Sequence, residues 1–462
     1  MTLIKSISGI RGTIGGSVGD NLTPVDTVKF ASAYGSWLKK ETKKEHPKVV
    51  VGRDARISGS MIQQLVMNSL VGLGIDVIDL GLSTTPTVEV AVPLEKADGG
   101  IILTASHNPK QWNALKLLNS KGEFLNAENG KKILEIAEND GYTFAEVDDL
   151  GNITINDTYI DKHIDKVLNL SLVNAEIIRK ARFKVVVDAV NSTGGIAVPR
   201  LLKKLGVAVV ELYCEPNGHF PHNPEPLKEH LTDLSELVVK EKADFGLTVD
   251  PDVDRLAFIS EDGEMFGEEY TLVACADFVL GKTPGNTVSN LSSSRALRDV
   301  TEKHNGNYEA SAVGEVNVVE KMKTNNAVIG GEGNGGIIYP ELHYGRDSLV
   351  GIALFLTHLA EKKCSVSELR NSYPSYFMSK NKIQLTPDLN VDEILDGFHK
   401  KHSSEEVSTV DGVKVDFDDS WVHLRKSNTE PIIRIYTEAL SQEKADQLAE
   451  DTITTLKRIA GI

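Results

Sequence analysis

Short apolar runs recur along the chain, and each ends in a loop rich in glycine or polar residues. They form three successive pairs: "KVVVGRDAR" (48–56) with "GIILTASHNP" (100–109), "FKVVVDAVNSTGG" (183–195) with "ADFGLTVDPDVDR" (243–255), and "NTVSNLSSS" (286–294) with "AVIGGEGNGG" (327–336). Apolar runs of this length between turn residues predict buried strands. With the helical stretches that separate them, they predict three successive α/β units built on one repeated pattern.

Helix signals lie between these strands. Thr23, Pro24 and Asp26 are typical of a helix start, with a capping side chain, a proline at the first helical position and an acidic residue close behind. A second helix is expected to end at Gly74. Its predicted apolar face consists of Met61, Leu65, Leu70 and Leu73.

The pattern changes after residue 370. A helix-like stretch (391–402) precedes three strand-like runs (411–417, 420–431 and 432–439), and a final helix is expected from about Ser441. This order predicts a smaller C-terminal α+β domain. The expected domains are residues 1–152, 153–257, 258–370 and 371–462.

Size and charge narrow the class of protein. A chain of 462 residues is too long for a single core. Its 66 acidic and 50 basic residues give a net charge of −16, which argues against a nucleic-acid partner but not against an anionic small molecule. No apolar run has membrane-spanning length, and the first 16 residues do not resemble a signal peptide. Three widely spaced cysteines fit reduced thiols, so we expect a cytoplasmic protein without a membrane partner.

The stretch "DPDVDR" carries three carboxylates at alternate positions, Asp250, Asp252 and Asp254. In an extended segment these side chains point the same way, where they repel each other unless a cation lies among them. Oxygen ligands of this kind suit Mg²⁺, Ca²⁺ or Mn²⁺. A solvated acidic turn is the alternative interpretation.

Ser106 and His107 lie in "LTASHNPK", directly after a predicted strand. Ligands of open α/β sheets bind at the carboxyl ends of strands, so this loop is a candidate site. Turn chemistry alone explains a Ser-His-Asn-Pro sequence equally well.

Two further loops have the composition of ligand-binding segments. In "RKSNTEP", Arg425 offers a planar cation, Ser427, Asn428 and Thr429 offer polar groups and backbone N–H groups, and Arg434 follows closely, a combination that suits phosphate. In "GGEGNGG" (330–336), the five glycines allow close backbone approach, and Glu332 with Asn334 suits sugar hydroxyls. Either stretch is also compatible with an ordinary loop.

Taken together and in this order, "TASHNP", "DPDVDR", "GEGNGG" and "RKSNTEP" resemble the active-site loops of the α-D-phosphohexomutases. "SGIRGTIG", "VGRDAR" and "PNGHFPHNPEP" are also similar to that family. The resemblance implies three related α/β domains with mixed sheets and a smaller C-terminal α+β domain, arranged around a central cleft. It also implies a phosphoserine at Ser106. It further implies Mg²⁺ held by Asp250, Asp252, Asp254 and Ser106, positive charge from Arg11 and Arg255, and proton transfer by Lys116 or His107.

The implied reaction interconverts a hexose 6-phosphate and a hexose 1-phosphate through a hexose 1,6-bisphosphate. The sequence "TEPIIRIYTEA" looks more like phosphoglucosamine mutases, whereas Asn334 and Gly336 stand where many bacterial members have serine and histidine. Glucosamine phosphate is the expected substrate, with glucose or mannose phosphate as the alternative. A metal-dependent sugar phosphatase and a non-catalytic sugar-phosphate sensor are further alternatives. The expected assembly is a monomer or a homodimer.

Overall fold

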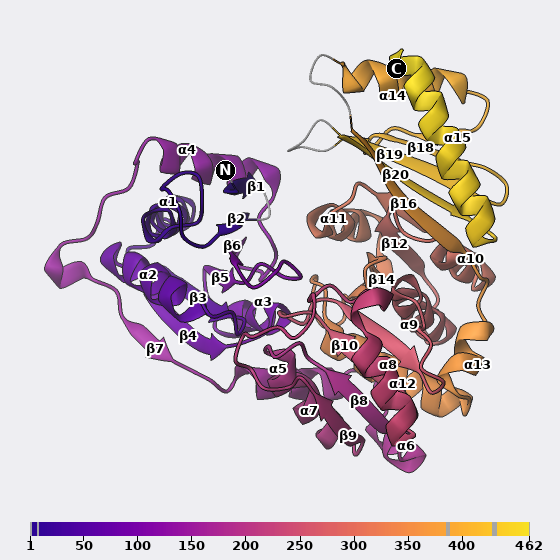
Figure 1. The fold of residues 1–462 in the computed structure, drawn as a ribbon. Helices are drawn as coiled ribbons and strands as arrows, with labels where there is room; N and C mark the ends of the chain where they lie inside the picture. The colour runs from indigo at the N-terminus through magenta and orange to yellow at the C-terminus, as the bar shows by residue number, and fades with distance from the viewer. Residues whose placement is uncertain (1, 7–8, 385–388, 427–431, 462) are drawn as a thin grey trace.

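The computed structural model describes residues 2–6, 9–384, 389–426 and 432–461. Within these residues the strands form four sheets, whose units follow one another along an arc from the first unit, at the left of Figure 1, to the last, at the upper right. Three sheets are mixed and the fourth is antiparallel. The predicted fold class is therefore confirmed.

The first unit has a seven-stranded sheet of order β1-β2-β6-β5-β3-β4-β7. Its strands are β1 (Ile4–Ser6), β2 (Gly9–Thr13), β3 (Lys48–Arg53), β4 (Asp76–Leu82), β5 (Gly99–Leu103), β6 (Trp112–Leu118) and β7 (Ile153–Ile155). Its helices are α1 (Pro24–Thr42), α2 (Gly59–Gly72), α3 (Thr85–Leu94) and α4 (Ala127–Glu138), with a short 3-10 turn at Val147–Asp149.

The predicted helix start at Thr23 is confirmed, because Thr23 caps α1 and forms a reciprocal capping box with Asp26. The predicted apolar face of α2 is wrong at one position. Ile62, Val66 and Leu70 face the core, whereas Met61 is 40% exposed. The buried stripe follows the four-residue step from Ile62, which lies about 100° around the helix from Met61.

The second and third units each contain a four-stranded sheet, of order β11-β10-β8-β9 and β13-β12-β14-β15. The strands of the second are β8 (Lys184–Asp188), β9 (Ala208–Leu212), β10 (Phe245–Val249) and β11 (Leu256–Ser260). Those of the third are β12 (Asn286–Asn290), β13 (Tyr308–Ser311), β14 (Ala327–Glu332) and β15 (Gly336–Ile338).

The helices of the second unit are α5 (Tyr159–Leu168), α6 (Ala175–Ala181), α7 (Gly194–Lys204) and α8 (Thr232–Glu241), with a 3-10 turn at Lys228–His230. Those of the third are α9 (Glu268–Lys282), α10 (Ala296–Lys303), α11 (Glu315–Asn325), α12 (Ser348–Lys362) and α13 (Val366–Asn371). The sheets depart from the expected domain ranges at two points. β7, after residue 152, still pairs with β4, and residue 257 lies inside β11. An apolar run in the sequence does not reveal which sheet a strand joins.

One strand arrangement occurs in all three α/β units. β3, β4, β5 and β6 lie in the order β6-β5-β3-β4, and the equivalent orders are β11-β10-β8-β9 and β15-β14-β12-β13. In each, three strands run parallel and the fourth pairs antiparallel with the third. The three units are therefore related in topology, as the repeated sequence pattern predicts.

The second and third units share one apolar core, whereas the first and fourth units have separate core clusters. Phe258 of β11 stacks on Phe355 of α12 with ring centroids 3.9 Å apart, and Phe245 and Phe266 pack edge-on against Phe355. A contact of this kind fixes two units relative to each other, because separating them would expose the aromatic side chains to water.

The fourth unit has an antiparallel sheet of order β16-β20-β19-β18-β17. Its strands are β16 (Phe377–Gln384), β17 (Glu406–Ser408), β18 (Val413–Asp416), β19 (Trp421–Lys426) and β20 (Ile432–Ala439), and its helices are α14 (Val391–Lys401) and α15 (Gln442–Ala460). Ser441 caps α15, as the predicted helix start requires, and the buried face of α15 includes Ala445, Ala449 and Leu456. Among the described helices, none is both long enough and apolar enough to cross a membrane.

Candidate active site

Three of the four candidate loops occupy the same topological position. Each connects the third parallel strand of its unit to the antiparallel fourth strand: β5 to β6 carries Ser106, β10 to β11 carries Asp250, and β14 to β15 follows Glu332. Because parallel strands present their carboxyl ends at one edge of a sheet, each unit contributes an equivalent loop.

Ser106 has a left-handed backbone conformation, with φ of 49°. Such a conformation costs of order 1–3 kcal/mol in a residue other than glycine and persists only where the surroundings enforce it. Here the Ser106 N–H donates to Oγ1 of Thr104 at 2.9 Å, and the Ser106 hydroxyl donates to Oδ2 of Asp250 at 2.8 Å. The buried hydroxyl is therefore aimed from the first unit at the acidic loop of the second.

Arg56 stabilises the loop that carries Ser106. Its fully buried guanidinium pairs with Asp54 at 2.9 Å and donates to four backbone carbonyls of the loop. The accepting carbonyls belong to Ser106, Asn108, Pro109 and Trp112. One side chain thus satisfies four backbone carbonyl groups, which explains how a segment without regular structure is held in place.

Replacing Arg56 by methionine is expected to lower the free energy of unfolding of the first unit by about 3–5 kcal/mol, because Asp54 then keeps a buried charge without its partner. Urea unfolding followed by tryptophan fluorescence measures the change. Arg53→Met is the matched control, since Arg53 lies in the same segment and is only half-buried. Equal unfolding midpoints for the two variants would contradict this role of Arg56.

Asp250, Asp252 and Asp254 converge, with one carboxylate oxygen of each within 4.8 Å of the others. The sequence predicts an extended segment for these three residues, and this prediction is wrong. The loop is a turn in which Val253 has φ of 65°, and the N–H groups of Asp254 and Arg255 both donate to Oδ1 of Asp250 at 3.1 Å. The convergence therefore comes from the turn and not from strand alternation.

The acidic cluster fits a divalent cation. All three aspartates are completely buried, and Oδ1 of Asp252 and Oδ1 of Asp254 have no hydrogen-bond partner among the described residues. Burial raises the pKa of Asp250 well above its ordinary value, and the charges of Asp252 and Asp254 raise it further. Unpartnered carboxylate oxygens in such a site are the ligands that Mg²⁺ and similar hard cations bind.

Lys116 of β6 lies against the same cluster. Its Nζ is 2.7 Å from Oδ2 of Asp252 and 3.4 Å from Oδ2 of Asp254. Burial alone would lower the pKa of Lys116, but the two carboxylates outweigh burial and raise it. Thr85, at the start of α3, donates to the same Asp252 oxygen at 2.6 Å, so the first unit contacts the acidic loop at three points.

His107 contacts Ser106, and Arg255 lies within electrostatic range of His107. Nδ1 of His107 lies 3.3 Å from the Ser106 Oγ. Burial lowers the pKa of His107 to about 2, and the positive charge of Arg255 acts in the same direction, so the ring is neutral at physiological pH. Arg255 contacts Glu225 at 3.4 Å, and its Nε has no hydrogen-bond partner among the described residues.

Glu332, at the end of β14, is tied to the acidic loop by Arg346. The Arg346 guanidinium contacts Glu332 at 2.8 Å, Asp254 at 2.7 Å and Glu315 at 3.1 Å. The other Glu332 oxygen accepts from the amide of Asn290 at 2.9 Å. The Glu332 carboxylate and the three aspartates of the acidic cluster are therefore parts of one buried charge network.

Two glycines of "GGEGNGG", Gly333 and Gly335, pack closely against neighbouring protein atoms. A Cβ at position 333 would lie about 2 Å from the Glu269 carboxylate, and one at 335 would lie 2.1 Å from the Leu256 carbonyl. Both glycines are required by neighbouring protein atoms, and Gly335 also has φ of 83°. Asn334, between them, is half-buried and accepts a hydrogen bond from the N–H of Gly336 at 3.2 Å.

The candidate phosphate loop is described only at its ends, because Ser427, Asn428 and Thr429 lie outside the described residues. Arg425 of β19 is directly opposite Arg434 of β20, and Arg434 is directly opposite Lys382 of β16. Directly opposite residues of antiparallel strands share a face, so three cations form a row. Arg425 also pairs with Asp411 at 2.8 Å.

Arg11, on the exposed face of β2, lies within electrostatic range of this row. The pKa of Arg11 is lowered by partial burial and by the charge of Arg434. Cations placed side by side repel each other, and the arrangement becomes favourable when an anion lies among them. Strands of the first and fourth units thus present positive charge to the same region.

Sequence reasoning missed three site residues: Arg56, Arg346 and Lys382. Arg56 had a signal, since "VGRDAR" ends a buried strand and places a second arginine two residues after an acidic residue. Lys382 could have been found from the pairing of β16 with β20. Arg346 had no local signal, because it is 92 residues from the aspartate that it contacts.

Comparison with known proteins agrees with this geometry. Models of the four domains of phosphoglucomutase/phosphomannomutase match the chain in order: alpha/beta/alpha domain I at residues 3–143, domain II at 161–263, domain III at 267–376 and the C-terminal domain at 380–455.

Relatives match over nearly the whole chain. A "phosphoglucomutase/phosphomannomutase" of Thermococcus kodakarensis is 37% identical, with 96% of this chain and 98% of the relative covered. A "probable phosphoglucosamine mutase" of Methanopyrus kandleri is 32% identical, with 98% and 97% covered. The crystal structure of a phosphoglucomutase/phosphomannomutase family protein from Burkholderia thailandensis superposes with a TM-score of 0.85 at 26% identity, covering 99% of this chain and 98% of that one.

Proposed function

The chain belongs to the phosphoglucomutase/phosphomannomutase family of sugar-phosphate mutases, and we propose that it moves a phosphoryl group between O6 and O1 of a hexose through a phosphate ester on Ser106. The observation that carries the proposal is the contact of the Ser106 hydroxyl with Asp250 at 2.8 Å. It joins a buried serine of one unit to a buried carboxylate cluster of the next, which suits phosphoryl transfer better than acyl transfer.

In the first half-reaction, O1 of a hexose 6-phosphate attacks phosphorus. The Ser106 Oγ–P bond breaks, the O1–P bond forms, and the proton of the O1 hydroxyl passes to a neighbouring base. His107, neutral and 3.3 Å from the Ser106 Oγ, is the candidate acceptor. Lys116, kept protonated by Asp252 and Asp254, is the candidate donor of a proton to the leaving Ser106 Oγ. The 1,6-bisphosphate then reverses its orientation. The Ser106 hydroxyl gives up its proton and its Oγ attacks the O6 phosphoryl group, the O6–P bond breaks while O6 takes up a proton, and hexose 1-phosphate leaves.

Asp250, Asp252 and Asp254 would hold Mg²⁺ together with an oxygen at Ser106. When bound, the cation supplies neutralisation of the negative charge on the transferring phosphoryl oxygens. Arg255, whose charge acts on His107, would add a second positive charge, and its Nε–H has no hydrogen-bond partner among the described residues. The unpartnered oxygens of Asp252 and Asp254 support this role.

The row of cations at the fourth unit would bind the phosphate that does not react. Because each sugar orientation places a different phosphate there, the site must recognise phosphate and not the sugar. Lys382, Arg425 and Arg434 supply three cations on one sheet face, and Arg11 faces them from the first unit.

Replacing Arg434 by alanine is expected to raise the KM for hexose phosphate by about 10–100-fold, because charge-assisted hydrogen bonds contribute about 1.5–3 kcal/mol each. Steady-state kinetics with a fixed amount of bisphosphate measure the change. Lys426→Ala is the matched control, since Lys426 neighbours Arg425 on the strand but pairs with Asp392 at 2.9 Å. A KM that changes equally in both variants would contradict the phosphate role of Arg434.

Glucosamine 6-phosphate is the proposed substrate, in support of amino-sugar nucleotide synthesis. The "probable phosphoglucosamine mutase" of Methanopyrus kandleri supports this choice, whereas the Thermococcus kodakarensis relative, at higher identity, favours glucose or mannose phosphate. The deciding experiment compares turnover of glucosamine, glucose and mannose 6-phosphates, each with a catalytic amount of its own bisphosphate and Mg²⁺. Release of inorganic phosphate in place of isomerised sugar phosphate would identify a phosphatase and refute the mutase proposal.

A further inference from the structure

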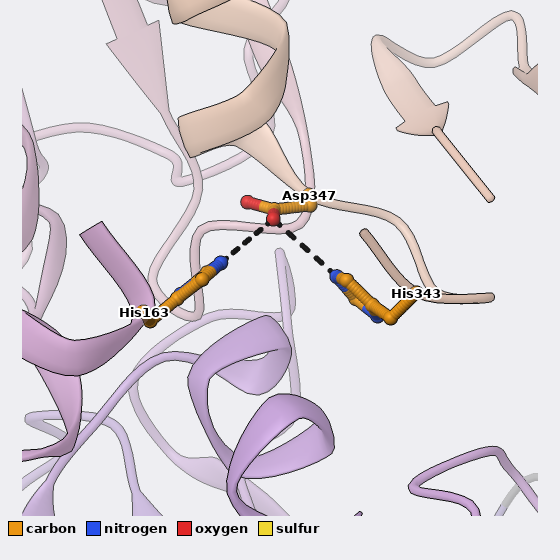
Figure 2. A group of neighbouring side chains, drawn as sticks. All are labelled: His163, His343 and Asp347. Atoms are coloured by element: carbon orange, nitrogen blue, oxygen red, sulfur yellow. Dashed lines mark hydrogen bonds and ion pairs between the residues drawn. The ribbon is translucent and has the colours of Figure 1, made fainter. Parts of the chain in front are cut away.

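A second group of metal-binding side chains lies outside the acidic loop. His163 of α5 in the second unit meets His343 and Asp347, which precede α12 in the third unit (Figure 2). Potential ligand atoms of the three side chains all lie within 4.8 Å of one another. The side chains of His163 and Asp347 are fully buried, and that of His343 is 10% exposed.

Both imidazole rings present the same nitrogen to one carboxylate oxygen. Nε2 of His163 is 2.8 Å from Oδ2 of Asp347, and Nε2 of His343 is 3.3 Å from the same atom. Donors bound tetrahedrally to Zn²⁺ at 2.0–2.1 Å are separated by about 3.3 Å. A small shift of these side chains therefore suffices to bring all three within bonding distance of one ion.

Asp347 Oδ1 and His163 Nδ1 have hydrogen-bonding partners of the kind found around metal ligands. Oδ1 of Asp347 accepts from the backbone N–H of Leu349 at 2.8 Å, which fixes the carboxylate at the start of α12. Nδ1 of His163 lies 3.0 Å from the hydroxyl of Thr87. Metal-binding histidines usually have a hydrogen-bonding partner behind the ring, which sets the tautomer and the orientation.

Glu89 of α3, in the first unit, is the corresponding partner of the His343 ring. Its Oε2 is 3.3 Å from Nδ1 of His343, and the side chain is 1% exposed. Neither Glu89 oxygen has a geometrically satisfactory hydrogen bond among the described residues, nor does Nδ1 of His343. A buried, unsatisfied carboxylate is costly by itself, and it is the usual partner of an imidazole that binds a metal.

We propose that His163, His343 and Asp347 bind one structural Zn²⁺ ion that links the second and third units, with Glu89 of the first unit orienting His343. Two imidazoles and one carboxylate suit Zn²⁺, whereas Mg²⁺ prefers oxygen ligands alone. The ion is distinct from the one proposed at Asp250, Asp252 and Asp254, whose donors are all oxygen.

The direct test is anomalous diffraction from crystals of the full chain, grown with excess Mg²⁺ and soaked in dilute Zn²⁺, recorded on both sides of the zinc absorption edge. The expected result is a zinc peak between the two Nε2 atoms of His163 and His343. A map with no zinc there, or with zinc only at Asp250–Asp254, would overturn the proposal, and this readout does not depend on any variant folding.

Competition titration with a chromogenic zinc chelator, in excess Mg²⁺, gives the affinity in solution. His163→Gln is expected to abolish the tight site, and Glu89→Gln to weaken it by about 10–100-fold, the usual effect of losing the partner of a ligating histidine. His358→Gln is the matched control, because His358 is a buried histidine of the third unit that contacts Tyr373 instead. Equal zinc binding by wild type and His163→Gln would also overturn the proposal.

Discussion

Replacing Ser106 by alanine is expected to reduce mutase turnover by about 10⁴-fold or more, the scale of loss when a covalent nucleophile is removed from an enzyme. The variant loses the atom that would carry the phosphoryl group between the two half-reactions. The fold should persist, since the contacts of Arg56 and Thr104 with the loop involve the backbone of residue 106. A coupled assay for hexose 1-phosphate measures turnover, and thermal unfolding verifies the fold.

Intact-mass analysis after incubation with hexose 1,6-bisphosphate and Mg²⁺ gives an independent readout. The wild-type chain should gain one phosphate, and Ser106→Ala should gain none. Ser32→Ala is a suitable control, because Ser32 is fully buried in α1 with no hydrogen-bond partner for its hydroxyl among the described residues. A phosphorylated Ser106→Ala chain, or one with near-normal turnover, would refute the role of Ser106.

The sequence predicts the strands and their loops well, because apolar runs and turn residues are local signals. Ser106, Asp250 and Glu332 each follow a run that reads as a buried strand, and each run is the third parallel strand of its unit. What the pattern cannot show is that the three loops are topologically equivalent. That equivalence depends on strand order, which is set by pairing between distant segments and leaves no mark in any one of them.

The buried charge network is invisible to local reasoning for the same reason. Arg346 joins Asp254 and Glu332 through side chains that only the folded chain brings together. Local geometry also misled the interpretation of the acidic loop, where a turn at Val253 replaces the extended segment. The sequence shows which charged side chains the chain contains, and the tertiary structure determines which of them come into contact.

The contact between the first and second units determines where the proposed chemistry can occur. Ser106, Thr85 and Lys116 of the first unit all reach the acidic loop of the second. Phosphoryl transfer depends on positioning, so a small displacement of either unit would separate the serine from the carboxylates. The carboxylates themselves, and not only the serine, should therefore be indispensable.

Replacing Asp252 by asparagine is expected to lower kcat by about 10³-fold and to raise the Mg²⁺ concentration needed for half-maximal activity, because a bound metal contributes several kcal/mol to transition-state stabilisation. The substitution keeps the size of the side chain and removes its charge. It removes the charge from Oδ1 of residue 252, which has no hydrogen-bond partner among the described residues. It also weakens the ion pair between residue 252 and Lys116. Initial rates measured over a Mg²⁺ series separate the change in kcat from the change in metal affinity.

Asp277→Asn is the matched control for this prediction. Asp277 is also a buried aspartate with a cationic neighbour, Lys303 at 3.4 Å, but it lies in α9 and faces His304 and Tyr373. Its substitution should change stability without changing the Mg²⁺ dependence. If Asp252→Asn remains folded and keeps the wild-type Mg²⁺ requirement within about twofold, which corresponds to less than about 0.5 kcal/mol of metal binding, the acidic loop does not hold the metal, and the transferred phosphoryl group must be neutralised by the surrounding arginines alone.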